Sequence, residues 1–187
     1  MSIASELRRA LARGNVAPAA VATFVAIGLF AGYLYTKNRL AQERLSSLAN
    51  TDMVRYLDEL RRLEGFDTYL SVYRERMGFA DFRPRAPRFL IGRWTLRDEA
   101  VRLPPSGSFA ECDQPLVIEY GRIAITASPA VAEEAAYRLT EDEELEVRTE
   151  RNGVIPITIV AHGTRIDHLE LTPPGREDRM FAYPCRA

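Results

Sequence analysis

A run of 23 residues without a charged side chain, residues 14–36, lies near the amino terminus. As an α-helix rising about 1.5 Å per residue it would be about 34 Å long, and the hydrocarbon core of a bilayer is about 30 Å thick. No later segment is comparably apolar. We therefore expect a short tail over residues 1–15, one transmembrane helix over residues 16–36, and the rest of the chain on one side of a membrane.

A cleaved signal peptide is the alternative to a retained anchor. Such a peptide has a shorter apolar core, and small residues stand one and three positions before its cleavage site. If the chain were cleaved after Ala31 or Gly32, the residue three positions before the cut would be Leu29 or Phe30, and both are too large for that position. The sequence therefore favours a signal anchor that stays in the chain.

The direction of the span does not follow from charge, because three basic residues flank each end. The short amino-terminal tail favours a carboxyl-terminal domain outside the cytoplasm. The only two cysteines, Cys112 and Cys185, both lie in that domain, as an oxidising compartment would favour, although two unrelated thiols are the alternative. With no Asn-x-Ser/Thr sequon present, we expect a bacterial inner membrane and a periplasmic domain. The residues expected at the membrane interface are Tyr33, Tyr35 and Lys37.

Small residues within the span offer places where another helix could approach closely. Ala22 and Ala26 form one small-xxx-small pair, and Gly28 and Gly32 form another. In lipid the hydrophobic effect does not bring helices together, because the lipid tails are as apolar as the side chains. Close packing drives helix association instead. These four residues are candidates for helix packing, although chance spacing explains them equally well.

Residues 37–80 are predicted to form a helical neck. Residues 38–48 prolong the membrane helix, and Asn50 or Thr51 is expected to cap a further helix that ends at Gly65. A second short helix, capped by Asp67 or Thr68, is expected to end near Gly78. Both helices carry an apolar stripe that the domain's own core would cover, with a partner subunit as the alternative. The stripe residues are Met53, Tyr56, Leu57, Leu60 and Leu63 in the first helix, and Tyr69, Leu70, Tyr73 and Met77 in the second.

An arginine–proline tract over residues 81–88 is predicted to link the neck to the next domain. Its arginines could instead contact lipid phosphates or an acidic neighbour. The solvated linker is the interpretation that we favour.

Residues 89–187 show the two-residue alternation of β-strands, interrupted by turn signals such as Asn152-Gly153 and His162-Gly163. Short alternating runs at this spacing predict an antiparallel meander that closes into a small barrel or sandwich. Residues 128–135 are expected to interrupt the meander as a loop or a helical turn. The predicted fold class is α+β, with a transmembrane helix, a helical neck and a small β-barrel.

The first predicted strand contains Gly92-Arg93-Trp94. A Gly-x-Trp opening, followed by a meander and a cysteine near the chain end, resembles the lipocalin-like small barrels over residues 88–187. The resemblance implies that Trp94 plugs the closed end of the barrel and that Cys185 bonds back to Cys112. It also implies a hydrophobic ligand, although the interior of a barrel this short is expected to be apolar and filled.

Candidates for metal binding or catalysis are few. His162 and His168 flank one turn, and a two-residue loop would pair residue 159 with His168 and turn the two rings to opposite faces, which disfavours a shared metal. An acidic patch lacks the spacing of a calcium loop and is interpreted as a solvated turn, with a basic soluble partner as the alternative. Its residues are Glu141, Asp142, Glu143 and Glu144.

The sequence contains no nucleophile elbow, no phosphate-binding glycine loop and no Cys-x-x-Cys. A net charge of −1 argues against nucleic acid as a partner. We therefore expect neither an enzyme nor a cofactor, but an accessory or assembly subunit that contacts integral membrane subunits of a larger complex. A respiratory or photosynthetic complex fits this description, as does a secretion or division machine, and an envelope protein that binds a hydrophobic ligand is the alternative.

Overall fold

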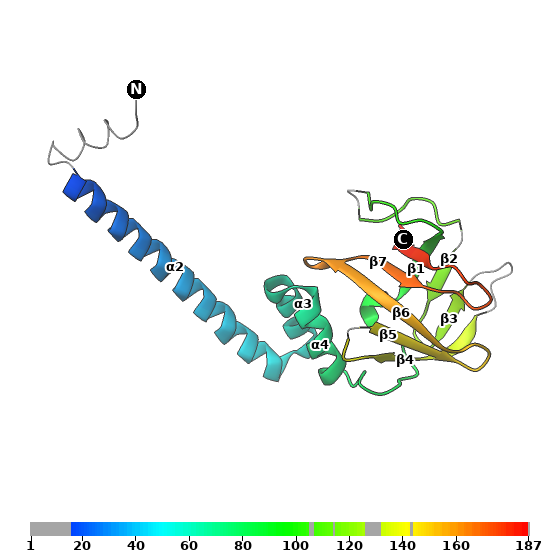
Figure 1. Ribbon diagram of the computed structural model, residues 1–187. Helices are drawn as coiled ribbons and strands as arrows, with labels where there is room; N and C mark the ends of the chain where they lie inside the picture. Colours follow the sequence, from blue (N-terminus) through cyan, green and yellow to red (C-terminus); the bar gives the residue numbers. More distant parts are fainter. Residues whose placement is uncertain (1–15, 105–106, 114, 126–131, 143, 187) are drawn as a thin grey trace, which may run out of the picture. The chain divides into compact units, whose positions relative to one another are not determined.

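The computed structural model describes residues 16–104, 107–113, 115–125, 132–142 and 144–186, with the side chains of residues 16–19 left out. The chain divides into two compact units, with the boundary between Tyr56 and Leu57. The first unit is mostly a single long helix, and the second combines short helices with a β-barrel (Figure 1). Glu143, one of the four residues of the predicted acidic patch, and the predicted tail over residues 1–15 lie outside the described residues.

Helix α2 (Val16–Thr51) runs for 36 residues without a break. At about 1.5 Å per residue it is about 54 Å long, so it exceeds the thickness of a bilayer core. Its first half contains the apolar run, and its second half carries Lys37, Arg39, Glu43 and Arg44. The expected prolongation of the apolar helix beyond residue 37 is therefore confirmed.

Helix α3 (Met53–Glu64) begins at a different cap from the one expected. Thr51 and Asn50 donate their side-chain hydrogen bonds back to carbonyls of α2, whereas the N–H of Arg55 donates to Oδ1 of Asp52 at 3.1 Å. Asp52 therefore accepts the first-turn hydrogen bond that a helix start requires.

Helix α4 (Phe66–Arg76) begins earlier than predicted, with Gly65 at its N-cap and no side-chain cap. The N–H of Phe66 donates instead to the carbonyl of Gly163 at 3.0 Å. Gly65 has φ +90°, which only glycine adopts readily. A tertiary hydrogen bond thus replaces the cap expected from Asp67 or Thr68.

Eight antiparallel strands in sequence order form a closed barrel, in which β1 pairs with both β2 and β8. Each strand is hydrogen-bonded to its neighbours along the chain, as in an up-and-down meander. The fold class is therefore α+β, as predicted. The strands are β1 (Gly92–Arg97), β2 (Pro115–Ile118), β3 (Arg122–Ile125), β4 (Glu133–Leu139), β5 (Glu144–Thr149), β6 (Gly153–His162), β7 (Arg165–Leu171) and β8 (Met180–Pro184).

Two details of the strands differ from the predictions. Residues 133–135, expected in a loop or helical turn, belong to β4, while residues 126–131 lie outside the described residues. A register shift between Val160 and Ala161 places His168 opposite Val160 and not opposite Ile159. The extra residue of this bulge, Asp167, moves the pairing by one position beyond the hairpin turn. Val160 shares a face of β6 with His162, so the prediction that the two histidine rings point to opposite faces is wrong.

The barrel interior is apolar and filled. The inward-facing side chains named at the end of this paragraph each expose no more than 6% of their surface, so they are closely packed. This confirms the expectation of a packed interior over the described residues. The interior residues are Trp94, Leu96, Leu116, Ile118, Ile123, Ala135, Tyr137, Leu139, Leu145, Val147, Thr149, Ile155, Ile157, Leu169, Leu171, Met180 and Ala182.

Residues 79–86 form backbone hydrogen bonds to β4 and to the turn between β2 and β3. Arg83 and Tyr137 exchange two such bonds, and the N–H of Ala86 donates to the carbonyl of Tyr120. The ring of Phe82 lies under two arginines of the outer face, with the guanidinium carbons of Arg138 and Arg148 at 4.6 and 4.1 Å from its centroid. The first part of the predicted linker is therefore packed against the barrel.

Candidate functional site

The surface of α2 is the first candidate site. Its large apolar side chains between Val21 and Tyr35 expose between 48% and 75% of their surface. Successive residues of a helix are about 100° apart, so these side chains point in every direction around the axis. This helix could cross a membrane by its length and composition, and a signal sequence near the amino terminus has the same properties.

The four small residues of α2 form two notches. An added Cβ at Gly28 or Gly32 would meet nothing within 4 Å. Ala22 and Ala26 lie one turn apart on a different side of the helix, because Gly28 follows Ala26 by two residues, or about 200°. Both notches are open along the helix surface and can accept a second helix.

Tyr33, Tyr35 and Lys37 follow the apolar run within α2. The two tyrosine rings are exposed, at 61% and 70%. Arg39 and Glu43, one turn apart, form an ion pair at 2.9 Å just beyond them. The change from apolar to ion-paired side chains occurs within one or two helical turns, as at a membrane interface.

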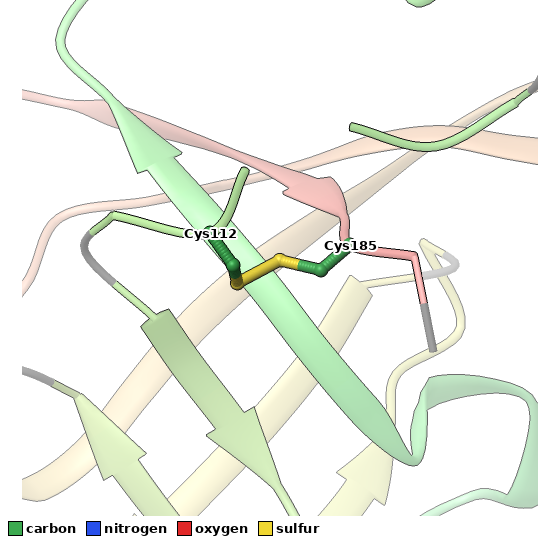
Figure 2. Close-up of a disulfide and its surroundings, with 2 residues drawn as sticks. All are labelled: Cys112 and Cys185. Atoms are coloured by element: carbon green, nitrogen blue, oxygen red, sulfur yellow. A yellow bond between two sulfur atoms is a disulfide. The ribbon is translucent and has the colours of Figure 1, made fainter. Parts of the chain in front are cut away.

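A disulfide joins Cys112 and Cys185, as the resemblance implied (Figure 2). It links the loop that precedes β2 to the residue that follows β8, across 73 positions of sequence. The N–H of Cys185 donates to the carbonyl of Arg93, so the chain after β8 remains paired with β1. Bonded cysteines are typical of proteins in oxidising compartments.

Trp94 faces the barrel interior at the end where β1 begins. Its Nε1–H donates to the carbonyl of Leu90 at 3.0 Å, within the short helix η1 (Arg88–Leu90) that leads into β1. Both side chains are buried. Trp94 is therefore placed where a plug at this end of the barrel would lie.

A pocket of about 480 Å³ lies at the same end of the barrel, and Trp94 of the interior lines part of it. Its apolar lining includes Phe89, Ile91 and Trp94, from η1, β1 and the residue between them. Four arginines and no carboxylate line it among the described residues. They are Arg61, Arg93, Arg165 and Arg186.

The four arginines come from α3, β1, β7 and the chain after β8. Arg61 is fixed in place, because its Nε–H donates to the carbonyl of Thr164 at 2.5 Å and its guanidinium lies 4.9 Å from the centroid of the Phe66 ring. Within the part of the chain that the structure describes, no carboxylate lies within ion-pair distance of any of these guanidinium groups. Sequence analysis missed this cluster because its members are scattered over 126 positions, without a motif.

The predicted acidic patch lies at the turn between β4 and β5. Glu141 forms an ion pair with Arg74 of α4 at 3.1 Å, and Glu144 accepts a hydrogen bond from Thr158 at 3.4 Å. Asp142 is exposed, and Glu143 lies outside the described residues. Part of the negative charge of this turn is therefore balanced by the helix packed beside it.

The two histidines lie in different surroundings. His162 is exposed at the end of β6. His168 is largely buried against Phe181 and Tyr183 of β8, and its ring nitrogens contact Asp167 at 2.8 Å and Glu170 at 3.3 Å. Over the residues that the structure describes, no group of three or more His, Cys, Asp or Glu side chains is placed to hold a metal ion.

Four tyrosines of the second unit have phenol groups with a shifted pKa. Burial raises the pKa of Tyr69, Tyr73, Tyr137 and Tyr183 above the ordinary value. The hydroxyl of Tyr137 donates to the carbonyl of Arg122 at 2.9 Å, and that of Tyr183 accepts from the N–H of Val101 at 2.8 Å. These groups stabilise the fold in their neutral form.

Comparison with protein-family models, with curated proteins and with solved structures found no match for this chain. The closed eight-stranded antiparallel barrel is compatible with a lipocalin-like small barrel.

Proposed function

We propose that this protein is a non-catalytic accessory or assembly subunit of a larger membrane complex. In this proposal α2 stays in the membrane and binds integral membrane subunits, while the barrel unit presents a rigid surface beside them. The observation that carries the proposal is the surface of α2 between Val21 and Tyr35, which is apolar and exposed on every side. Such a helix needs lipid or other helices all around it.

Three further features support this function. The open notches at Ala22, Ala26, Gly28 and Gly32 allow the close approach that holds membrane helices together. The disulfide favours a barrel unit on the oxidising side, which for a bacterial inner membrane is the periplasm. The filled barrel makes a scaffold a better assignment than a carrier. A respiratory or photosynthetic complex is a suitable host.

A lipocalin-like relationship is part of the same proposal. The Gly92-x-Trp94 opening, the preceding η1 and the closed barrel support it. We do not extend it to a ligand within the barrel, because packed side chains occupy that space.

Replacing the glycine notch with bulky apolar residues tests the role of α2. The full chain with Gly28→Leu and Gly32→Leu should still insert, because leucine is more apolar than glycine, but it should lose its partner subunits. Gentle detergent extraction followed by size analysis and mass spectrometry measures this loss. The control is Ile27→Leu with Leu29→Ile, which conserves the volume of neighbouring side chains.

The proposal predicts that membrane subunits co-migrate with the unmodified chain and with the control, and are absent or at least tenfold depleted with the Gly28→Leu/Gly32→Leu chain. An unmodified chain that migrates as a lone monomer would contradict membership of a complex. Equal recovery of partners by both variants would contradict a contact through Gly28 and Gly32.

A further inference from the structure

We infer that the arginine-lined pocket beside Trp94 binds an anionic amphiphile, a molecule with a carboxylate or phosphate head and a hydrocarbon chain. The pocket volume of about 480 Å³ lies within the range of small-molecule sites, which is about 300–1,000 Å³. Trp94 belongs both to the lining of this pocket and to the packed interior of the barrel.

The charge of the pocket defines the head group. Arg61, Arg93, Arg165 and Arg186 bring four positive charges to one pocket, and no carboxylate among the described residues pairs with them. Like charges gathered in this way repel one another, and an anion that binds among them removes that repulsion. Guanidinium groups also match the geometry of carboxylate and phosphate oxygens.

The floor of the pocket defines the rest of the ligand. Phe89, Ile91, Trp94, Ile166 and Pro184 supply apolar surface beside the charges. Ile91 is 43% exposed, although the nearby apolar residues Leu90 and Trp94 are both buried. An inorganic anion would leave this surface in water, whereas a hydrocarbon chain would cover it.

Part of the site is held rigid before a ligand arrives. The hydrogen bond from Arg61 to Thr164 fixes one guanidinium, and the bond from Trp94 to Leu90 fixes the indole. The disulfide at Cys185 holds the chain that carries Arg186. A preformed site loses less conformational entropy on binding than a flexible one.

The ligand has two possible sources with the same chemistry. A free fatty acid reaches the pocket from solution, and an anionic phospholipid reaches it from a bilayer. Only the second source rests on the membrane anchor proposed above.

Trp94 is the only tryptophan of the chain, so its fluorescence reports on the pocket directly. The full chain is mixed with phosphatidylcholine vesicles and titrated with a brominated stearate, whose bromine atoms quench tryptophan on contact. In a second arm, a brominated phosphatidylglycerol is included in the vesicles. A brominated stearyl alcohol is the neutral control for the first arm, and a brominated phosphatidylcholine is the neutral control for the second.

The inference predicts saturable quenching by at least one of the two anionic probes, with at least tenfold weaker quenching by its neutral counterpart. Arg93→Gln with Arg165→Gln should raise the apparent dissociation constant at least tenfold. The matched control, Arg122→Gln with Arg151→Gln, removes two exposed arginines elsewhere on the barrel and should change it less than twofold.

Quenching that is absent, that is equal for anionic and neutral probes, or that responds equally to both double variants would overturn the site. Flotation of the same samples on a density gradient tests the anchor separately. A chain that does not float with the vesicles but is quenched by free stearate would contradict the anchor and support the pocket.

Discussion

Single buried tyrosines make the stability of the second unit sensitive to alkaline pH. Tyr69 and Tyr73 lie in α4, within a cluster of aromatic rings that includes Phe66, Phe79 and Phe89. Burial raises the pKa of both phenols, because the charged phenolate would lose its hydration.

We predict that the barrel unit loses stability as the pH rises above about 10, the ordinary pKa of tyrosine. The unfolded chain releases the phenolic protons near that pH, whereas the folded chain keeps them up to its raised pKa values. Stability is therefore fully present below pH 10 and falls above it, by up to about 1.4 kcal/mol per pH unit for each tyrosine. Urea unfolding of the full chain in detergent, followed by circular dichroism, measures this slope.

Tyr69→Phe removes one titrating group, and no hydrogen bond of the Tyr69 hydroxyl is among those that the structure records. The variant should lose stability less steeply above pH 10 than the unmodified chain, and the two chains should show the same pH dependence near neutrality. Identical slopes for the two chains would contradict the assignment.

At the level of single residues, the resemblance predicted the disulfide, whereas nothing in the sequence predicted the arginine pocket. Cys112 and Cys185 are the only cysteines, so few alternatives existed. Arg61 and Arg186 are 125 positions apart and come together only when the barrel closes. The cap of α4 also depends on tertiary structure, because its first N–H donates to Gly163.

At the level of elements, residues 79–86 add backbone hydrogen bonds beside β4. Over the residues described on either side of the β3–β4 connection, two paired positions are recorded, Arg122 with Glu134 and Ile123 with Glu133. The bonds of Arg83 to Tyr137 therefore satisfy backbone groups of β4 that β3 does not reach. Phe82 holds this segment in place through the two guanidinium groups that flank its ring.

Phe82→Ala is predicted to destabilise the barrel unit by about 1–3 kcal/mol, because it removes a half-buried ring and two cation–π contacts. Urea unfolding near neutral pH, followed by Trp94 fluorescence, measures the change. Tyr120→Ala is the control, since that ring is 61% exposed, and it should cost less than about 0.5 kcal/mol. Equal effects of the two variants would mean that Phe82 does not hold the segment against the barrel.

Most strands could be predicted because large apolar residues alternate along them, as Ile155 and Ile157 do in β6. The first half of β4 reads Glu-Glu-Ala-Ala, which has no such alternation. It becomes a strand because its two glutamates pair with β3 and its two alanines pair with β5. The closure of β1 against β8 joins the two ends of the domain, which local patterns do not specify.

At the level of the whole molecule, two units divide the tasks that we propose. The first contains a helix that could cross a membrane and whose apolar side chains are exposed on every side, and the second contains a packed barrel joined by a disulfide. The length of the apolar run predicted the long helix of the first unit, and the two-residue alternation of apolar side chains predicted the strands of the second. The complex that the protein would serve does not follow from either pattern.

Retention of α2 in the membrane is the central claim, and the mass of the chain recovered from washed membranes tests it most directly. Cells are lysed, membranes are washed at alkaline pH, and the protein is alkylated without reductant before mass spectrometry. The account predicts an intact chain of 21.1 kDa in the membrane fraction with no alkyl group on either cysteine. A chain that begins after Tyr35, or that is recovered in the aqueous wash, would contradict the claim.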